Sequence, residues 1–440
     1  MQEVTLHQML DAREMRAALQ KSLIDTYKTP LVCFTMNIAG PIKTSRLIER
    51  AFFEGVELLQ SRLPNESILH RETDVSVTGC QAMFCVSMDA KKLKAICTDI
   101  EDSCPLGRLF DMDVLDTTGR KLSRENLRGC IVCGASGREC AASRLHTVPQ
   151  LQASTCKIIT EHFFPIDCRQ FADLATDSLL EEVYTTPKPG LVDRSNNGSH
   201  TDMDISLFVK SAHSLTPYFH RCVEIGYETR HLSQDKAFEQ LRTAGIEAEK
   251  TMFETTNGVN THKGAIFSLG VLCGALGRLW KARSHIPTLD NLLSVCSQLV
   301  SKAVREDLSI IDTSTAGGRF YHKYGLLGIR GEVASGFSSV KDIGLPVFRK
   351  ALDKGYSRNE AGAITLVHLI SLVEDTNLYN RADKAGADFA KNSAKEMLRN
   401  CDFPKISQIE RLDDLFISRN LSPGGCADLL AVTYFLAQLQ

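Results

Sequence analysis

The sequence predicts two domains of different class: an α/β or α+β domain over residues 1–165 and a mainly α-helical bundle over residues 166–440. Three observations predict this division. The chain has 440 residues, which is too many for one compact hydrophobic core. Strand-like and helical patterns alternate in the first part, whereas after about residue 165 the apolar residues recur with helical spacing. Ten of the 15 cysteines lie at or before Cys168, which indicates parts of different character.

The first domain is expected to alternate between helices and strands. The apolar, β-branched run LVCFTMNIAG predicts a strand that ends at Gly40 and Pro41. The segment after this turn has helical spacing, with Thr44 or Ser45 as its capping residue. Helices are expected at 1–28, at 44–63 and from Lys91 onward, and strands within 31–40, 74–90 and 108–116.

The second domain is expected to consist of apolar helices joined by polar, glycine-rich loops. The helix-like segments are 171–184, 205–215, 265–280, 289–304, 361–373 and 427–439. The most apolar stretch, 265–277, is shorter than the roughly 20 residues that a membrane span needs. Its glycines at Gly270, Gly274 and Gly277 predict a buried helix in close contact with a neighbour.

Charge and cysteine content narrow the class of protein. A net charge of -2 gives no electrostatic footprint for nucleic acid. No secretory signal is visible in the charged N-terminal segment, and 15 cysteines in that setting are typical of free thiols in a reducing compartment. We therefore expect a cytoplasmic protein that binds neither nucleic acid nor a membrane.

The tripeptide Asp-Met-Asp occurs twice, and its first copy lies in the predicted strand RLFDMDVLD. Alternate residues of a strand face the same side, so Asp111 and Asp113 would lie side by side. Such carboxylates repel each other unless a cation lies between them, and Mg²⁺ commonly joins carboxylates to phosphate oxygens. Lys43 and Arg108 are the candidate phosphate contacts. The alternative is a pair of solvent-exposed acids on an edge strand.

The segment CIVCGASGRECAASRLH holds Cys130, Cys133, Cys140 and His146. These are the ligand types of a structural zinc site, and its first two cysteines have the spacing of a zinc knuckle. The spacing of the full set is not that of a standard zinc finger. Free thiols near a turn are the alternative.

The second copy of Asp-Met-Asp precedes a predicted helix, in which residues i and i+2 do not share a face. Thr201 and Asp204 fit a capping box at the start of that helix. The long polar segment before it indicates either a solvated loop or a binding site. Its candidate site residues are Lys188, Asp193, Asn197, His200, Asp202 and Asp204.

Other polar, glycine-rich loops also adjoin apolar helices. The loop before residue 265 lacks the glycine spacing of a Walker A loop, but a basic helix N-terminus suits a phosphate. Because acids favour Mg²⁺ and basic loops favour phosphates, the expected ligand is a metal-bound polyphosphate. The candidate site residues of these loops are Asn260, His262, Lys263, Arg330, Asp375, Asn377 and Asp428, and Arg319 lies in the same glycine-rich segment as Arg330.

These segments together resemble known families. Over most of residues 170–440 the chain resembles triphosphoribosyl-dephospho-coenzyme A synthase, in the segments TPKPGLVDRSNNGSHTDMD, GVNTHKGAIFSLGVLCGA, GLLGIRGEVASGF, EDTN and NLSPGGCADLLAVTYFLA. Over about residues 10–165 it resembles the apo-citrate lyase phosphoribosyl-dephospho-coenzyme A transferase, in the segments FTMNIAGPIKTS, GRLFDMDVLD and CIVCGASGRECAASRLH. The whole chain therefore resembles the bifunctional fusion of the two enzymes.

The resemblance implies a two-step pathway. The C-terminal domain would join ATP to 3′-dephospho-coenzyme A through a ribose–ribose bond and release adenine. The N-terminal domain would be nucleotidyltransferase-like, with Asp111 and Asp113 holding Mg²⁺. It would transfer the phosphoribosyl-dephospho-coenzyme A group to a serine of the citrate lyase acyl carrier (γ) subunit and release pyrophosphate.

Displacement of adenine from the ribose needs a carboxylate that stabilises an oxocarbenium-like transition state or activates the attacking hydroxyl. The carboxylate candidates are Asp193, Asp202, Asp204, Asp375 and Asp428. We expect the acids and bases of the loops to converge on one pocket, with Lys188, Lys263 and Arg330 on the triphosphate. Two other functions remain open at this point: a helical, Mg²⁺-dependent N-glycohydrolase acting on nucleotides, and a non-catalytic nucleotide sensor.

Overall fold

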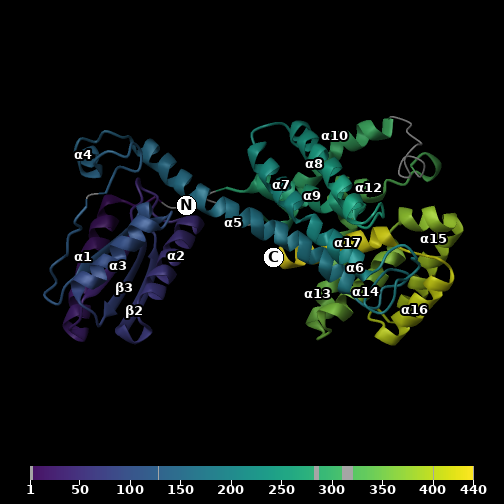
Figure 1. Cartoon of the computed structure of the whole chain (residues 1–440), viewed down its shortest axis with the longest axis horizontal. Coiled ribbons are helices and arrows are strands. Elements are labelled where there is room, and N and C mark those ends of the chain that lie inside the picture. The colour runs from purple at the N-terminus through teal and green to yellow at the C-terminus, as the bar shows by residue number, and fades with distance from the viewer. Residues whose placement is uncertain (1–2, 127, 282–286, 310–320, 400, 440) are drawn as a thin grey trace. The chain divides into compact units, whose positions relative to one another are not determined.

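The computed structural model describes residues 3–126, 128–281, 287–309, 321–399 and 401–439. The chain forms two compact units, the first reaching Ile166 and the second comprising Asp167–Trp280 and the residues from Pro287 onward (Figure 1). The division falls inside one long helix, α5 (Val148–Tyr184), close to its internal Pro165. The two-domain organisation expected from the sequence agrees with these units.

The first unit contains a four-stranded sheet in the order β2-β3-β1-β4. Its strands are β1 (Leu31–Met36), β2 (Ile68–Ser76), β3 (Gly79–Val86) and β4 (Phe110–Leu115). Every pairing is antiparallel, so the unit is α+β and not α/β. The strand region predicted within 74–90 contains β3, the second strand of a hairpin. The first strand of this hairpin, β2, is an edge strand with mostly polar, exposed residues, so the sequence of β2 shows little alternation.

Helices pack against this sheet. They are α1 (Leu6–Tyr27), α2 (Arg46–Arg62) and α3 (Ala90–Ser103). The unit also contains the short α4 (Gly137–Ala142) and the 3-10 turns η1 (Asn65–Ser67) and η2 (Gly107–Leu109). Leu23 and Ile24 of α1 pack on the face that carries Cys33. On the opposite face the Phe34 ring lies 5.1 Å from the ring of Phe52 on α2. Helix α2 is capped by Ser45, one of the two caps predicted.

The described residues of the second unit are helical, as predicted (Figure 1). After the end of α5 its elements are α6 (Ile205–Ser214), α7 (Thr216–Glu228), α8 (Gln234–Thr255), α9 (Lys263–Leu279), α10 (Leu289–Ser309), α12 (Gly328–Ala334), the π-helical turn η3 (Val340–Gly344), α13 (Leu345–Asp353), α14 (Arg358–Leu372), α15 (Thr376–Arg399), α16 (Ile406–Ser418) and α17 (Gly424–Leu439). Every segment with predicted helical spacing lies in one of these helices.

Glycines bring α7 and α9 to backbone contact. A Cβ on Gly226 of α7 would lie 1.9 Å from the Gly274 carbonyl oxygen, and a Cβ on Gly277 of α9 would lie 1.9 Å from the Val223 carbonyl oxygen. The buried, closely packed helix predicted from its glycines is therefore confirmed. Within the described part of the chain, no helix combines the length and apolar character that a membrane crossing requires.

Candidate functional site

The second unit contains a cavity of about 700 Å³ at the beginning of several helices. The first residues of the long helices α9, α15 and α17 all line this cavity. Helix N-termini carry partial positive charge and unpaired N–H groups, so their convergence favours an anionic ligand. The sequence-predicted residues that line the cavity are Lys188, His200, Asn260, His262, Lys263, Arg330, Asn377 and Asp428.

The buried pair Glu182 and Lys188 and the partly buried Asp428 line the same cavity. Lys188 is 2% exposed, and its Nζ donates to Glu182 Oε1 at 2.5 Å. Burial raises the pKa of Glu182, while the adjacent charge of Lys188 opposes that rise. Burial, followed by the charges of Glu182 and Asp375, raises the pKa of Asp428 well above its usual range. Glu182 therefore has the cation of Lys188 beside it, whereas the charged neighbours of Asp428 are mainly acids.

His262 directly precedes α9 and is almost fully buried in the cavity wall. Its Nδ1 lies 2.9 Å from Ser211 Oγ, whereas its Nε2 has no hydrogen-bond partner among the described residues. Burial, followed by the charge of Lys188, lowers the pKa of His262 to about 3. The imidazole is therefore neutral near pH 7, with one ring nitrogen left for a ligand.

A second histidine of the cavity is held by hydrogen bonds on both ring nitrogens. The guanidinium of Arg381 lies 2.8 Å from His200 Nδ1, and His200 Nε2 lies 2.8 Å from Ser422 Oγ. Because a guanidinium only donates, Nδ1 accepts, and the proton of the neutral ring belongs on Nε2. Burial, followed by the charge of Arg381, lowers the pKa of His200 to about 4. His200 therefore donates to Ser422, whose hydroxyl hydrogen is left for another acceptor.

The rim of the cavity carries further charged groups. Lys263 Nζ lies 2.8 Å from Glu249 Oε2, and both side chains are partly exposed. The backbone N–H of Lys263 donates to Asn260 Oδ1 at 3.3 Å, which fixes the start of α9. Arg330 reaches the cavity from α12. Arg319, the other arginine predicted in that glycine-rich segment, lies outside the described residues.

Two predicted acids organise the loops and do not line the cavity. Asp193 accepts from the backbone N–H groups of Lys188 at 3.0 Å and of Ser195 at 2.6 Å. Asp375 accepts from the N–H of Asn377 at 2.8 Å and from the N–H of Cys426 at 2.8 Å, so it joins the beginnings of α15 and α17. Their carboxylates are occupied by backbone donors, which is why they shape the pocket from behind.

The remaining residues predicted in the polar loop also lie outside the cavity lining. Asp204 is the N-cap of α6 and accepts from Leu207 N at 2.8 Å, so the capping residue is Asp204 and not Thr201. Asp202 is exposed, 3.9 Å from His200 Nδ1. The backbone carbonyl oxygen of Asn197 accepts from the backbone N–H of His200 at 3.1 Å. Of the four acids expected to converge on one pocket, Asp428 lines the cavity, whereas Asp193, Asp202 and Asp375 do not.

In the first unit, Asp111 and Asp113 lie on one face of β4, opposite Thr35 and Cys33 of β1. Asp113 Oδ2 accepts from Lys121 Nζ at 2.5 Å. Partial desolvation, followed by the charge of Asp113, raises the pKa of Asp111. β4 is an edge strand of the sheet. A pair of solvent-exposed acids that binds no metal would therefore have the same geometry.

The two basic residues predicted beside the acid pair have other partners in the structure. Lys43 Nζ donates to the Ile38 carbonyl oxygen at 2.6 Å, and burial followed by the charge of Arg13 lowers its pKa. The guanidinium of Arg108 donates to the Gly129 carbonyl oxygen. Arg108 lines a separate cavity of about 800 Å³ in the first unit. The structure gives both residues backbone contacts and shows no contact between either of them and the acid pair.

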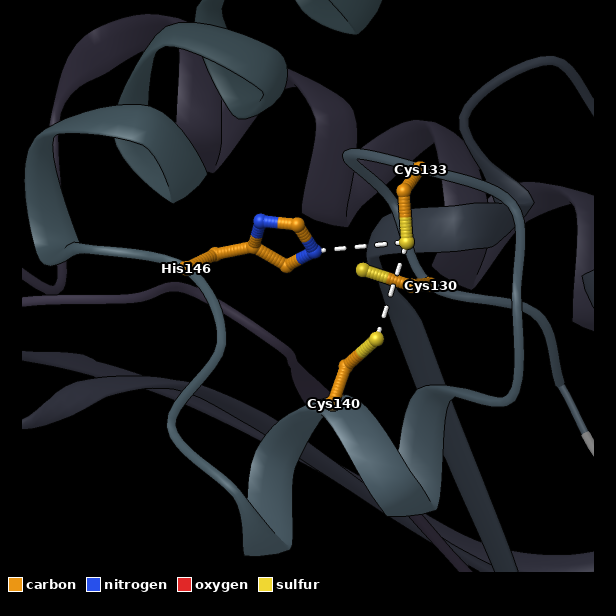
Figure 2. Close-up of side chains that lie close together, drawn as sticks. All are labelled: Cys130, Cys133, Cys140 and His146. Atoms are coloured by element: carbon orange, nitrogen blue, oxygen red, sulfur yellow. Dashed lines mark hydrogen bonds between the residues drawn. The ribbon is translucent and has the colours of Figure 1, made fainter.

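The four predicted zinc ligands, Cys130, Cys133, Cys140 and His146, are brought together and are named here the Cys3His cluster. One ligand atom from each lies within 4.8 Å of all the others. Figure 2 shows the three thiols and the imidazole directed toward one another. Cys133 Sγ lies 3.6 Å from Cys140 Sγ and 3.3 Å from His146 Nε2. The arrangement is therefore that of potential ligands around a common centre.

Each of the two units matches a known protein family. Residues 168–440 match the family described as ATP:dephospho-CoA triphosphoribosyl transferase, and residues 4–162 match the family described as apo-citrate lyase phosphoribosyl-dephospho-CoA transferase. The chain is 36% identical to Protein CitXG of Haemophilus influenzae, over 98% of this chain and 96% of that protein. The chain belongs to the CitXG family. It is also 33% identical to Protein CitXG of Leuconostoc mesenteroides, over 100% of this chain and 98% of that protein.

Membership of the CitXG family confirms the resemblance seen in the sequence for both domains. A separate relative covers the second unit: the probable 2-(5''-triphosphoribosyl)-3'-dephosphocoenzyme-A synthase of Vibrio cholerae is 40% identical, over 62% of this chain and 88% of that protein. The chain is therefore an enzyme with transferase activity that makes and attaches the citrate lyase prosthetic group. This membership favours the transferase over the glycohydrolase and the nucleotide sensor.

Sequence reasoning did not select Glu182 or Glu249, although both line the cavity. Glu182 lies inside the helical run EEVY, where an acid is normally read as part of a solvated face. The signal that marks it is its position two residues before the end of α5, next to the polar loop that carries Lys188. Arg381 and Ser422 were also not selected as site residues, because their roles depend on contacts with His200 from distant parts of the chain.

Proposed function

We propose that the cavity of the second unit is the active site that joins ATP to dephospho-coenzyme A. The observation that carries this proposal is the convergence of three helix N-termini on a cavity that is lined by one buried carboxylate, Glu182, and one partly buried carboxylate, Asp428. Triphosphoribosyl transfer needs both features: donors for a triphosphate, and acids at the reacting ribose.

The triphosphate would lie against the helix N-termini. Asn260 and Lys263 stand at the start of α9, Asn377 at the start of α15, and Arg330 projects from α12. Backbone N–H groups and cations in this arrangement bind phosphate oxygens. Lys263 would exchange its partner Glu249 for the phosphates, because that ion pair is partly exposed and therefore weak. Mg²⁺ would supply further charge neutralisation for the bound triphosphate.

Glu182 and Asp428 would have different roles at the ribose. Glu182, beside Lys188, provides the negative charge that stabilises an oxocarbenium-like transition state. Asp428, whose pKa is raised, retains a proton and donates it to adenine as the bond from ribose C1 to adenine breaks. The ribose hydroxyl of dephospho-coenzyme A forms the new bond to C1, and its proton returns to Asp428. Atoms and charge balance over this cycle, with adenine as the leaving group.

Removal of each acid tests this assignment. Asp428→Asn and Glu182→Gln should each lower the rate of adenine release by about 100-fold or more, while ATP binding changes little, because both act mainly in the transition state. Asp177→Asn, an exposed residue on the same helix as Glu182, is the matched control. Adenine release is measured by chromatography and ATP binding by calorimetry. Near-normal adenine release by both variants would exclude this cavity as the catalytic site.

For the first unit we propose nucleotidyltransferase-like chemistry at the acid pair. Asp111 and Asp113 offer adjacent carboxylate oxygens on one face of β4, which is a donor set that suits Mg²⁺. The ion would neutralise charge on the pyrophosphate leaving group. Lys121 would hold the Asp113 carboxylate in place through their ion pair and can shift to a phosphate when the donor binds. The acceptor would be the serine hydroxyl of the citrate lyase acyl carrier (γ) subunit.

A further inference from the structure

Two separations within the Cys3His cluster are close to those of a tetrahedral metal site. Tetrahedral zinc, with bonds of about 2.3 Å to sulfur and about 2.0 Å to nitrogen, places two sulfurs about 3.8 Å apart and a sulfur about 3.5 Å from a nitrogen. The observed separations are 3.6 Å between Cys133 Sγ and Cys140 Sγ and 3.3 Å between Cys133 Sγ and His146 Nε2. A disulfide would need a sulfur separation of about 2.05 Å. The spacing is therefore that of ligands around an ion and not that of a covalent bond.

The backbone around the first cysteine is also arranged as a metal-binding turn. The N–H of Val132 donates to Cys130 Sγ at 3.4 Å, and the N–H of Gly134 donates to the Cys130 carbonyl oxygen at 2.9 Å. Gly134 has φ of 75°, a left-handed conformation that glycine adopts at little cost. Backbone N–H donors to sulfur stabilise a thiolate, which is the form that binds zinc.

Apolar packing does not explain why this segment keeps its shape. Among residues 129–146, all of which the structure describes, only Cys140 is buried. The regular structure there is limited to the six-residue α4 and an isolated bridge between Gly129 and Ser136. Small segments that lack a core of their own are commonly held by a metal. A bound ion would supply the missing cross-link between Cys130 and His146.

We propose that the Cys3His cluster binds one structural Zn²⁺, which fixes the segment 129–146 as one wall of the cavity in the first unit. This segment supplies Cys130, Arg138, Cys140, Arg144 and His146 to the cavity lining. The described residues that line the cavity include four arginines and no acid. Three thiolates and one imidazole favour Zn²⁺ over Mg²⁺ or Ca²⁺, which prefer oxygen ligands. The metal binding is independent of the proposed transferase chemistry, whereas the effect on carrier modification rests on it.

The first test is metal analysis of the full-length chain after purification without chelators. We expect about one zinc per chain in the unmodified protein and at least a tenfold lower content in Cys133→Ser and His146→Ala. Cys401→Ser, which alters an exposed cysteine of the second unit, should keep the full zinc content. Equal zinc content in all four proteins, a metal other than zinc, or no metal in the unmodified protein would overturn the proposal.

The second test separates loss of zinc from loss of the proposed chemistry. Removal of zinc by a zinc-selective chelator, with Mg²⁺ in excess, should increase hydrogen exchange in peptides covering 129–146 by at least tenfold and should lower carrier modification, while adenine release by the second unit stays within twofold. Addition of Zn²⁺ should restore the protection. If zinc is present and protective but carrier modification does not depend on it, the metal site stands and its link to the transferase fails. Unchanged exchange after complete removal of zinc would refute the structural role.

Discussion

The two Asp-Met-Asp tripeptides have the same sequence and different structures. In β4, Asp111 and Asp113 share one face because alternate residues of a strand point the same way. Before α6, Asp202 is exposed, while Asp204 turns its carboxylate onto the backbone and caps the helix. The same residues therefore present either a pair of adjacent carboxylates or a single cap. The difference shows that the chemistry of a short motif is set by the backbone that carries it.

The comparison extends to the proposed sites of the two units. The acids of the first unit lie on the face of a sheet, where Asp113 already has a lysine partner. In the second unit Glu182 is buried and Asp428 is partly buried, and both come from helices and not from the conspicuous polar loop. The loop acid Asp193 supports the backbone instead. The motifs therefore marked the neighbourhood of the cavity and one of its carboxylates, Asp428, but not Glu182.

The sharpest test of the comparison exchanges one acid in each tripeptide. Asp111→Asn should reduce carrier modification by at least about 100-fold, because it removes a ligand of the proposed Mg²⁺ site. Adenine release should be unaffected, since it belongs to the other unit. Asp202→Asn should leave both reactions within about twofold. Carrier modification is measured by the mass increase of the acyl carrier subunit. An Asp111→Asn protein that labels the carrier at the normal rate would show that the strand pair is only a surface feature.

Burial of the second site also predicts a response to acid. His262 has a pKa of about 3 in the folded unit and about 6.5 when unfolded. The unfolded chain therefore binds a proton that the folded chain does not, and stability falls as the pH drops from about 6.5 toward 3. At pH 5 this costs about 2 kcal/mol. Denaturant unfolding of the second unit at pH 7 and pH 5 measures the loss.

His262→Gln should reduce the pH-dependent loss by about 2 kcal/mol, even if it lowers stability at pH 7, while the loss due to His200, whose pKa is about 4, remains. The exposed His231→Gln is the control and should retain the full loss. If the two variants lose the same stability between pH 7 and pH 5, His262 does not titrate as its burial predicts.

The smallest expected effect concerns the helix cap. Asp204→Ala should destabilise the second unit by about 1 kcal/mol, because the N–H of Leu207 loses its acceptor. Asp202→Ala should change the stability by less than about 0.5 kcal/mol, since its side chain is exposed. Thermal unfolding and hydrogen exchange in α6 measure both. Equal destabilisation by the two substitutions would contradict the assignment of Asp204 as the cap.

The sequence by itself determined the features that depend on local backbone geometry. The period of a strand places Asp111 beside Asp113, and the helical spacing of the apolar runs predicts the main helices of the second unit. The Cys3His cluster is similarly local, because its ligands lie within 17 residues of one another in the chain. Family motifs then identified both transferase domains, since those motifs are continuous in the sequence.

Tertiary structure alone decided which groups meet in the cavity. Glu182 and Asp428 are separated by most of the second unit, and only the packing of α5 and α17 brings them to one cavity. Packing likewise joins His200 to Arg381 and Ser422, and it directs Asp375 onto the start of α17. The physical reason is that a local pattern fixes neighbours within a turn or a strand, whereas burial and the pairing of distant polar groups depend on how helices pack together.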